Sequence, residues 1–247
     1  MNQIDDSEFF ATRNKQFIDS MAKDDGFKQL TKTWYDKADS YEYTYHFTWL
    51  GLPIIQYPQD IVAMQELVYR VKPDLIIETG IARGGSIIFY ASMLHLLNNN
   101  GRVIGIDIDI RQHNKIAIEQ HAMFKYITLV EGSSIDPLVI AKVSEIASKY
   151  KNILVVLDSN HTEDHVLMEL KSYSPLVKPS SYIVVFDTQI ENTDLVNNAD
   201  KPWGQGNNPM TAVKNFLQEN SRFQIDREIE DKLQITECPS GYLKCVG

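Results

Sequence analysis

The chain has 247 residues, of which 43% are hydrophobic and 23% charged, and its formal net charge is −9. These values are typical of a globular protein, and the length suffices for one large α/β domain. The acidic balance argues against a general nucleic-acid or anionic-membrane surface. No apolar run is long enough to cross a bilayer, and the N-terminus lacks the features of a signal peptide. We therefore expect a cytoplasmic protein with no nucleic-acid partner and no membrane span.

The cysteines fit a reducing compartment. Cys238 and Cys245 are the two cysteines of the chain, and they lie close together near the C-terminus. A disulfide between them is the alternative to two free thiols, which we expect.

The first fifty residues differ in character from the rest of the chain. Residues 1 to about 33 carry apolar side chains at roughly helical spacing, which predicts one or two helices outside the main sheet. Aromatic residues crowd into 34–49, where they cover a substrate pocket, form a subunit contact or pack on the core. We therefore expect an N-terminal extension over 1–50 and one domain over 51–247. Asp60 is expected to cap the helix that follows it.

From residue 73 onward, short apolar runs alternate with helical patterns. The runs predict strands at 75–79, 103–107, 126–131, 153–158 and 182–187, with helices near 86–98, 111–121, 137–149 and 163–172. Strands that alternate with helices pair in parallel through right-handed crossovers. The tail predicts further strands at 223–226, 233–236 and 241–246. The expected fold class is therefore α/β: a doubly wound, mostly parallel, Rossmann-like sheet with a C-terminal antiparallel strand.

The first strand of this series leads into a turn that contains glycines. Glu78 lies at the end of the strand, Gly80, Gly84 and Gly85 follow, and a helix pattern begins at Ser86. A strand, a glycine turn and a helix N-terminus form the first nucleotide-binding corner of such folds, because glycine lets backbone approach a ligand. The spacing is not G-x-G-x-x-G, so a turn that merely connects strand to helix is the alternative.

The residues after the next two strands are further candidates, because ligands bind at the carboxyl ends of parallel strands. Asp107 ends the second strand and is placed to bind both hydroxyls of a ribose. Asp109 is the alternative acid, and the sequence does not choose between the two. Ser133, Ser134 and Asp136 follow the third strand and are candidates for an adenine edge, with a helix N-cap as the alternative role.

Two acids end the fourth and fifth strands. Asp158 and Asp187 follow strands expected to be neighbours, so their carboxylates should face one spot. Such a pair is costly unless a cation lies between them or one is protonated, and oxygen ligands suit Mg²⁺, Mn²⁺ or Ca²⁺. His161 is close enough to act as a general base or a further ligand. The alternative is that the acids cap helices; His165 is expected to pack on the next helix.

A long polar loop over 188–210 follows the second of these acids. Long loops inside compact domains tend to be functional lids. Trp203 is expected to stack on a ring or a sugar face. Asn208 is expected to cap the following helix, whereas Asn207 either binds hydroxyls or caps.

Together these segments resemble the cephalosporin hydroxylase family of S-adenosylmethionine-dependent enzymes, which includes rhamnosyl O-methyltransferases. The matching segments are I-I-E-T-G-I-A-R-G-G-S-I, I-G-I-D-I-D-I-R, E-G-S-S-I-D-P, L-D-S-N-H-T-E-D-H-V, V-V-F-D-T, W-G-Q-G-N-N-P-M-T-A-V and G-Y-L-K. The resemblance implies a class I methyltransferase domain that transfers a methyl group from S-adenosylmethionine to a hydroxyl of a sugar, saccharide or glycosylated metabolite. It also implies a homo-oligomer, since related proteins assemble.

The resemblance also implies site residues. The cofactor-binding set lies on the glycine turn and after the next two strands: Glu78, Gly80, Arg83, Gly84, Ser86, Asp107, Ser133 and Ser134. The turn would line the methionine end of the cofactor, Asp107 its ribose and the serines its adenine. Asp158 and Asp187 would hold a divalent metal, Mg²⁺ first, and act in catalysis with His161.

One position departs from the family pattern. Many members have Glu before the second metal Asp, and this chain has Phe186. Either water, Asn160 or His161 completes a weaker site, or no metal binds. A non-catalytic protein that kept the cofactor pocket is therefore one alternative function. An NAD-dependent oxidoreductase is another, although the absence of G-x-G-x-x-G counts against it.

Overall fold

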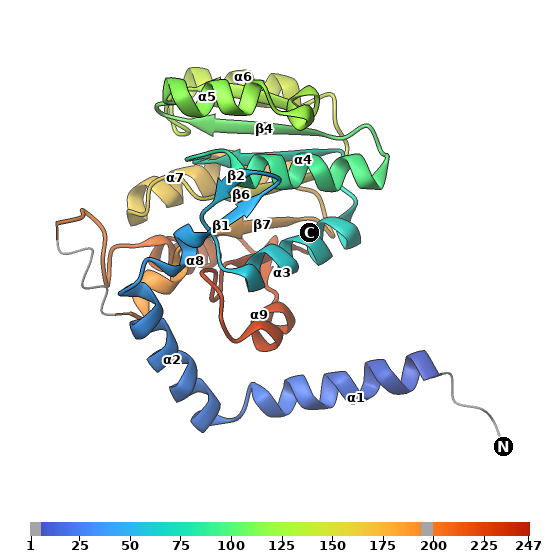
Figure 1. Cartoon of the computed structure of the whole chain (residues 1–247), viewed down its shortest axis with the longest axis vertical. Helices are drawn as coiled ribbons and strands as arrows, with labels where there is room; N and C mark the ends of the chain where they lie inside the picture. Colours follow the sequence, from blue (N-terminus) through green and yellow to red (C-terminus); the bar gives the residue numbers. More distant parts are fainter. Residues whose placement is uncertain (1–5, 194–199) are drawn as a thin grey trace.

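The computed structural model describes residues 6–193 and 200–247. Its centre is a β-sheet with helices around it (Figure 1). The sheet has seven strands in the order β5-β4-β3-β6-β7-β9-β8. The strands are β3 (Leu75–Thr79), β4 (Arg102–Asp107), β5 (Ile127–Glu131), β6 (Ile153–Leu157), β7 (Tyr182–Val185), β8 (Phe223–Ile225) and β9 (Tyr242–Cys245). Strands β3 to β7 pair in parallel, whereas β9 is antiparallel to both β7 and β8. The predicted α/β fold with an antiparallel C-terminal edge is therefore confirmed.

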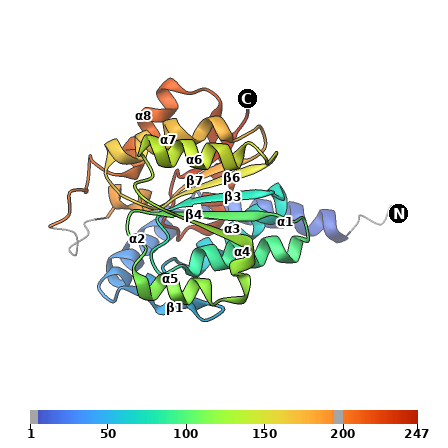
Figure 2. The ribbon, with the colours of Figure 1, turned by 90° about the horizontal axis from the view of Figure 1, so that it is seen from above.

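Helices cover both faces of the sheet, as Figure 2 shows. One face packs against α3 (Pro58–Val71), α4 (Gly85–Leu97), α5 (Gln112–Glu119) and α9 (Arg227–Leu233). The other packs against α6 (Pro137–Ala147), α7 (Glu163–Tyr173) and α8 (Pro209–Glu219). Because β3, β6 and β7 are buried on both faces, they consist of near-continuous apolar runs, which is why the sequence predicts them well. Short 3₁₀ turns complete the chain at η1 (Tyr43–His46), η2 (Ala122–Tyr126), η3 (Ser174–Leu176) and η4 (Thr188–Glu191).

Two local predictions are wrong, and one contact region explains both. Helix α3 begins at Pro58, whose fixed φ suits a first helical position, so Asp60 lies inside the first turn rather than at the cap. The fully buried Asp60 carboxylate instead accepts hydrogen bonds from the Thr236 hydroxyl and the Glu237 backbone N–H. The backbone of Thr236 is also bonded to the Tyr35 hydroxyl. Segment 233–236 therefore forms no strand, because the backbone and hydroxyl of Thr236 are hydrogen-bonded to the side chains of Tyr35 and Asp60 instead of to a neighbouring strand.

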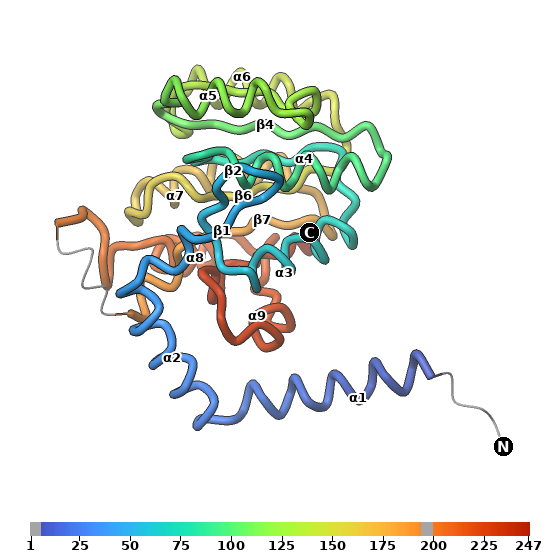
Figure 3. Tube along the Cα trace, in the orientation of Figure 1, coloured from blue at the N-terminus to red at the C-terminus, as the bar shows by residue number. Residues whose placement is uncertain are grey.

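The N-terminal extension begins with α1 (Asp6–Met21) and α2 (Asp25–Asp39), as expected, and α1 projects from the body and contacts α9 (Figure 3). A hairpin of β1 (Phe47–Trp49) and β2 (Leu52–Ile54) then packs on α4. The ring edge of Trp49 lies against Phe89 at 4.8 Å between centroids, and its Nε1 donates to Ser92 Oγ at 3.0 Å. The hairpin crosses residue 50, where the sequence predicts a domain boundary, and that division stays a prediction.

Two further expectations concern single features. Both cysteines are free and buried, as predicted. Of the helices within the described residues, none combines the length and the apolar character needed to cross a bilayer.

The turn after β3 lies directly against the end of β6. The Gly80 N–H donates to the carbonyl of Ile106 at 2.7 Å, and Gly80 has a φ of +80°. A Cβ at this position would lie 2.0 Å from the carbonyl oxygen of Asp158. Glycine is therefore required both by the left-handed backbone and by the space.

Gly80→Ala is expected to lower the free energy of unfolding by about 3 kcal/mol or more, because strain and a backbone clash add. Gly206→Ala is the matched control, since Gly206 has the same φ of +80° but nothing within 4 Å of its added Cβ. It should cost only about 1 kcal/mol. Denaturant titration measures both, and equal losses would contradict the proposed contact.

Candidate functional site

A cavity of about 620 Å³ opens at the carboxyl ends of the parallel strands. The strand order reverses between β3 and β6, which is where ligands bind in open α/β sheets. Gly80, Asp107, Asp158 and Asp187, each of which follows or ends a strand, line this cavity. The sequence therefore identifies the correct edge of the sheet.

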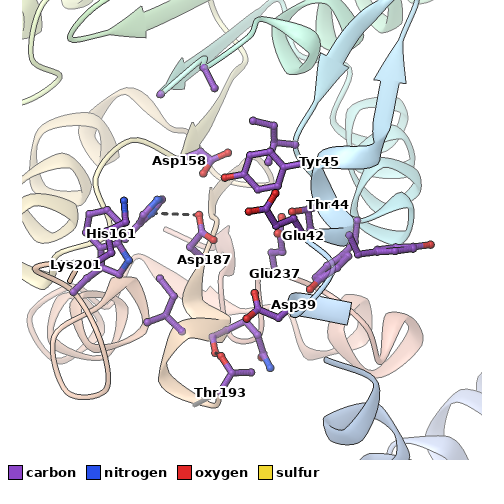
Figure 4. A pocket seen from close by; sticks show the side chains of 18 of the residues that line it. Asp39, Glu42, Thr44, Tyr45, Asp158, His161, Asp187, Thr193, Lys201 and Glu237 are labelled. Carbon is purple, nitrogen blue, oxygen red and sulfur yellow. Dashed lines mark hydrogen bonds and ion pairs between the residues drawn. The ribbon is translucent and has the colours of Figure 1, made fainter. Parts of the chain in front are cut away.

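Two acids and a histidine converge in the cavity. Asp158 follows β6, Asp187 follows β7, and these strands are neighbours, as predicted. Ligand atoms of Asp158, His161 and Asp187 all lie within 4.8 Å of one another. His161 Nδ1 lies 3.2 Å from Asp187 Oδ2 (Figure 4), and the edge of Trp203 packs on the His161 ring at 4.7 Å. Trp203 thus contacts the histidine and also lines the cavity, and its stacking on a ring or sugar face stays a prediction.

The electrostatics of this cluster favour a cation. Burial raises the pKa of Asp158 well above its usual range, and the neighbouring Asp187 and Glu237 raise it further. Burial, followed by the charge of Asp187, likewise raises the pKa of Glu237. Burial and like charges both disfavour the ionised carboxylates, and a bound cation would offset that cost. Two carboxylates and an imidazole within ligand distance therefore fit a divalent metal chemically.

Asn160 is not free to complete such a site. Its side-chain oxygen accepts hydrogen bonds from the backbone N–H and the hydroxyl of Thr162, at 2.9 and 2.7 Å. Phe186 is buried in the core, so it adds no polar atom to the cavity.

Glu78 lies beneath the glycine turn with its charge only partly compensated. Its Oε2 accepts a hydrogen bond from Ser86 Oγ at 2.8 Å, and its buried Oε1 has no partner among the described residues. Burial raises the pKa of Glu78 to about 8. An orphaned buried oxygen of this kind fits the ammonium end of an amino-acid ligand, which would pair with the ionised carboxylate.

The structure favours Asp107 over Asp109 as the acid of a ribose site. Asp107 lines the cavity, whereas Asp109 is exposed and lies outside the cavity wall. Asp107 Oδ2 accepts from the backbone N–H groups of Ile81 and Ala82 at 3.0 and 3.2 Å. Asp107 therefore also fixes the shape of the glycine turn.

Six of the predicted cofactor residues lie outside the described cavity wall: Glu78, Arg83, Gly84, Ser86, Ser133 and Ser134. Ser134 is buried, and its hydroxyl pairs with His165 Nε2 at 3.0 Å. His165 lies on α7, as expected, and Asp136 caps α6 by accepting from the Leu138 N–H. The cofactor roles of this set remain predictions.

The N-terminal extension forms a wall of the cavity that strand-end reasoning misses. Asp39, Glu42, Thr44 and Tyr45 line it from this side (Figure 4). The aromatic cluster of 34–49 thus both packs on the core and covers the pocket. Glu237 was also missed, since it follows a helix rather than a parallel strand.

The predicted lid loop over 188–210 borders the cavity, although 194–199 lie outside the described residues. A hydrogen bond joins the beginning and the end of this loop: the Glu191 carboxylate accepts from the Gly206 N–H at 2.9 Å. Asn208 caps α8 in a capping box, as predicted. Asn207 also serves a helix end, because its side-chain oxygen accepts from the Glu163 N–H at the start of α7.

The raised pKa of Glu78 generates a pH-dependent prediction. The folded-state value of about 8 lies above the ordinary 4.5, so the carboxyl stabilises the fold at low pH and this contribution is lost as pH rises through 8. Glu78→Gln, which cannot ionise, should therefore gain stability relative to wild type by roughly 3 kcal/mol between pH 5 and pH 9. Glu145→Gln at an exposed position of α6 is the control. Denaturant unfolding at each pH measures the difference, and parallel pH curves would contradict the assignment.

The sequence of this chain is similar to those of known methyltransferases. A family model described as Rhamnosyl O-methyltransferase/CmcI matches residues 41–246. Rhamnosyl O-methyltransferase of Mycobacterium tuberculosis (strain ATCC 25618 / H37Rv) is 28% identical over 199 residues, covering 79% of this chain and 77% of the relative. The Mycobacterium leprae (strain TN) protein of the same name is 26% identical over 198 residues, covering 79% and 82%.

Solved structures show the same fold. One described as "cmcI-D160 Mg-SAM" has a TM-score of 0.59 at 18% identity and covers 82% of this chain and 78% of its own. The O-methyltransferase TomG from Streptomyces achromogenes, in complex with SAM, has a TM-score of 0.51 at 17% identity and covers 77% and 80%. The family match spans the cavity, its acids and the C-terminal strands. The chain therefore belongs to the Rhamnosyl O-methyltransferase/CmcI family and is an S-adenosylmethionine-dependent O-methyltransferase, as its motifs predict.

Proposed function

We propose that this enzyme methylates a hydroxyl of a sugar, saccharide or glycosylated metabolite, with a divalent cation held by Asp158 and Asp187. The observation that carries the proposal is the convergence of Asp158, His161 and Asp187 in a cavity that also reaches Gly80 and Asp107. The similar Mycobacterium proteins are named rhamnosyl O-methyltransferases, which supports a sugar acceptor. The similar structure described as "cmcI-D160 Mg-SAM" supports Mg²⁺ and S-adenosylmethionine as the ligands. Mg²⁺ is therefore the first cation to test.

The residues of the cavity divide into two sides. On one side, the glycine turn and Asp107, with the buried Glu78 beneath the turn, would bind S-adenosylmethionine, whose sulfonium supplies the methyl group. On the other, Asp158 and Asp187 would hold Mg²⁺, which lowers the pKa of a nearby hydroxyl. Methyl transfer needs an acceptor oxygen in line with the methyl group, so positioning by the cavity walls contributes most of the catalysis.

His161 is the proposed general base. In the tautomer in which Nδ1–H donates to Asp187 Oδ2, Nε2 keeps the lone pair that removes the hydroxyl proton. Trp203 contacts the His161 ring edge to face, which helps to orient the imidazole. The acceptor oxygen then forms a bond to the methyl carbon as the methyl–sulfur bond breaks, which leaves a methyl ether, S-adenosylhomocysteine and a protonated imidazole.

The acceptor class is tested by measuring S-adenosylhomocysteine release with S-adenosylmethionine, Mg²⁺ and a panel of neutral glycosides, rhamnosides first. Turnover that stops with EDTA and returns with Mg²⁺ supports the proposal. Cofactor binding without turnover on the whole panel would contradict the proposed acceptor class.

Asp158→Asn and Asp187→Asn are each expected to lower kcat/KM by about 100-fold or more, because each removes a charged ligand. The dissociation constant for S-adenosylmethionine, measured by calorimetry, should change less than about threefold. Full turnover in both variants would exclude the paired-acid site.

His161→Gln is expected to lower kcat by roughly 100- to 1,000-fold, because removal of the hydroxyl proton by the general base is lost. His165→Gln is the matched control: it lies four residues on, in α7, and pairs with Ser134 and Glu169. Its kcat should stay within about threefold of wild type. An equal loss in both variants would contradict a specific role for His161.

The expected homo-oligomer and cytoplasmic location stay predictions. Helix α1 carries exposed Phe9, Phe10 and Phe17, which makes the extension the first surface to test for a subunit contact by light scattering.

A further inference from the structure

Glu237 is an acid that no motif singles out, and it lines the same cavity as Asp158 and Asp187 (Figure 4). Those two acids follow neighbouring parallel strands, whereas Glu237 belongs to the connection between α9 and β9. It therefore reaches the cavity from a part of the chain that is distant in sequence.

The backbone of Glu237 is fixed next to Asp187. Its N–H donates to Asp60 Oδ2 at 2.8 Å. Its carbonyl accepts from the Thr188 hydroxyl at 3.3 Å and from the Gln189 N–H at 3.2 Å, and these two residues directly follow Asp187. Contacts on both sides thus hold this acid at a set position relative to the proposed metal ligand.

The Glu237 carboxylate has no protein counter-charge. Within residues 6–193 and 200–247, no hydrogen-bond donor or basic side chain pairs with it. The two basic residues of the cavity wall are engaged elsewhere: His161 pairs with Asp187, and Lys201 lies over the Trp203 ring. The carboxylate is therefore available to a ligand of the cavity.

The candidate cation site has two carboxylates and one imidazole within ligand distance. Asp158 and Asp187 provide two carboxylates, Phe186 is buried and provides none, and the Asn160 oxygen is taken by Thr162. Mg²⁺ and Mn²⁺ favour several oxygen ligands, and affinity rises with the number of negative charges around the ion. Glu237 is the cavity acid whose backbone is bonded to the turn that follows Asp187.

We propose that Glu237, which lines the same cavity but lies outside the cluster of Asp158, His161 and Asp187, supplies a third negative charge to the cation site and so raises its affinity for a divalent cation. This inference rests on the proposed function, which assigns Asp158 and Asp187 as ligands.

The test is a Mn²⁺ titration of the full chain, in which electron paramagnetic resonance measures the free ion without any turnover. Glu237→Gln keeps the size and the backbone bonds of the residue and removes the charge, so it should weaken Mn²⁺ binding at least tenfold. Glu237→Asp keeps the charge on a side chain that is shorter by one methylene, so the carboxylate lies farther from the cation, and the Mn²⁺ affinity should be intermediate. Circular dichroism tests whether each variant is folded. If Glu237→Gln does not fold, the Mn²⁺ affinity of Glu237→Asp tests the proposal instead.

Glu42→Gln is the matched control, because Glu42 is an acid of the same cavity that comes from the N-terminal extension. It should change the affinity less than threefold. Equal Mn²⁺ affinity in wild type and Glu237→Gln would overturn the role of Glu237 and leave the proposed cation site intact. If Glu42→Gln weakened Mn²⁺ binding as much as Glu237→Gln, the effect would come from the total charge of the cavity, and the specific role of Glu237 would be overturned. Absence of Mn²⁺ binding by the wild-type chain would overturn the cation site itself.

Discussion

Backbone contact between Gly80 and Asp158 sets the distance between the glycine turn and the acidic end of the cavity. Any side chain at position 80 would meet the Asp158 carbonyl, so the end of β6 can approach the turn after β3 only because residue 80 is glycine. Methyl transfer requires donor and acceptor atoms to approach within van der Waals distance in line. A contact that places the two halves of the cavity side by side is therefore a precondition for the proposed chemistry.

A second constraint joins the two ends of the chain to this centre. Asp60, inside α3, accepts hydrogen bonds from Thr236, Glu237 and Tyr242. Burial raises the pKa of Asp60 to about 6, and these hydrogen bonds oppose that shift. Tyr35 of the extension binds the backbone of the same segment. The helix, the extension and the C-terminal connection thus meet at one buried point, which positions both the extension wall and Glu237 at the cavity.

Negative charge is concentrated in this cavity at a cost to stability. Asp158 and Glu237 both have raised pKa values because of burial and neighbouring acids, and Glu78 shows the same effect beneath the turn. Such groups oppose folding as they ionise, and cationic ligands offset the cost by binding the folded state. The arrangement fits a site that is completed by a positively charged cofactor and a cation.

The sequence by itself determined the parallel core and the acids at its strand ends. Buried parallel strands are local apolar runs, so the sequence predicts β3, β4, β6 and β7, and with them Asp107, Asp158 and Asp187 at or after the strand ends. Helix caps such as Asn208 are equally local. Only the tertiary structure decided the roles of Asp60 and Glu237 and the irregular course of 233–236. These depend on hydrogen bonds between residues more than 170 positions apart, for which neither periodicity nor spacing carries a signal.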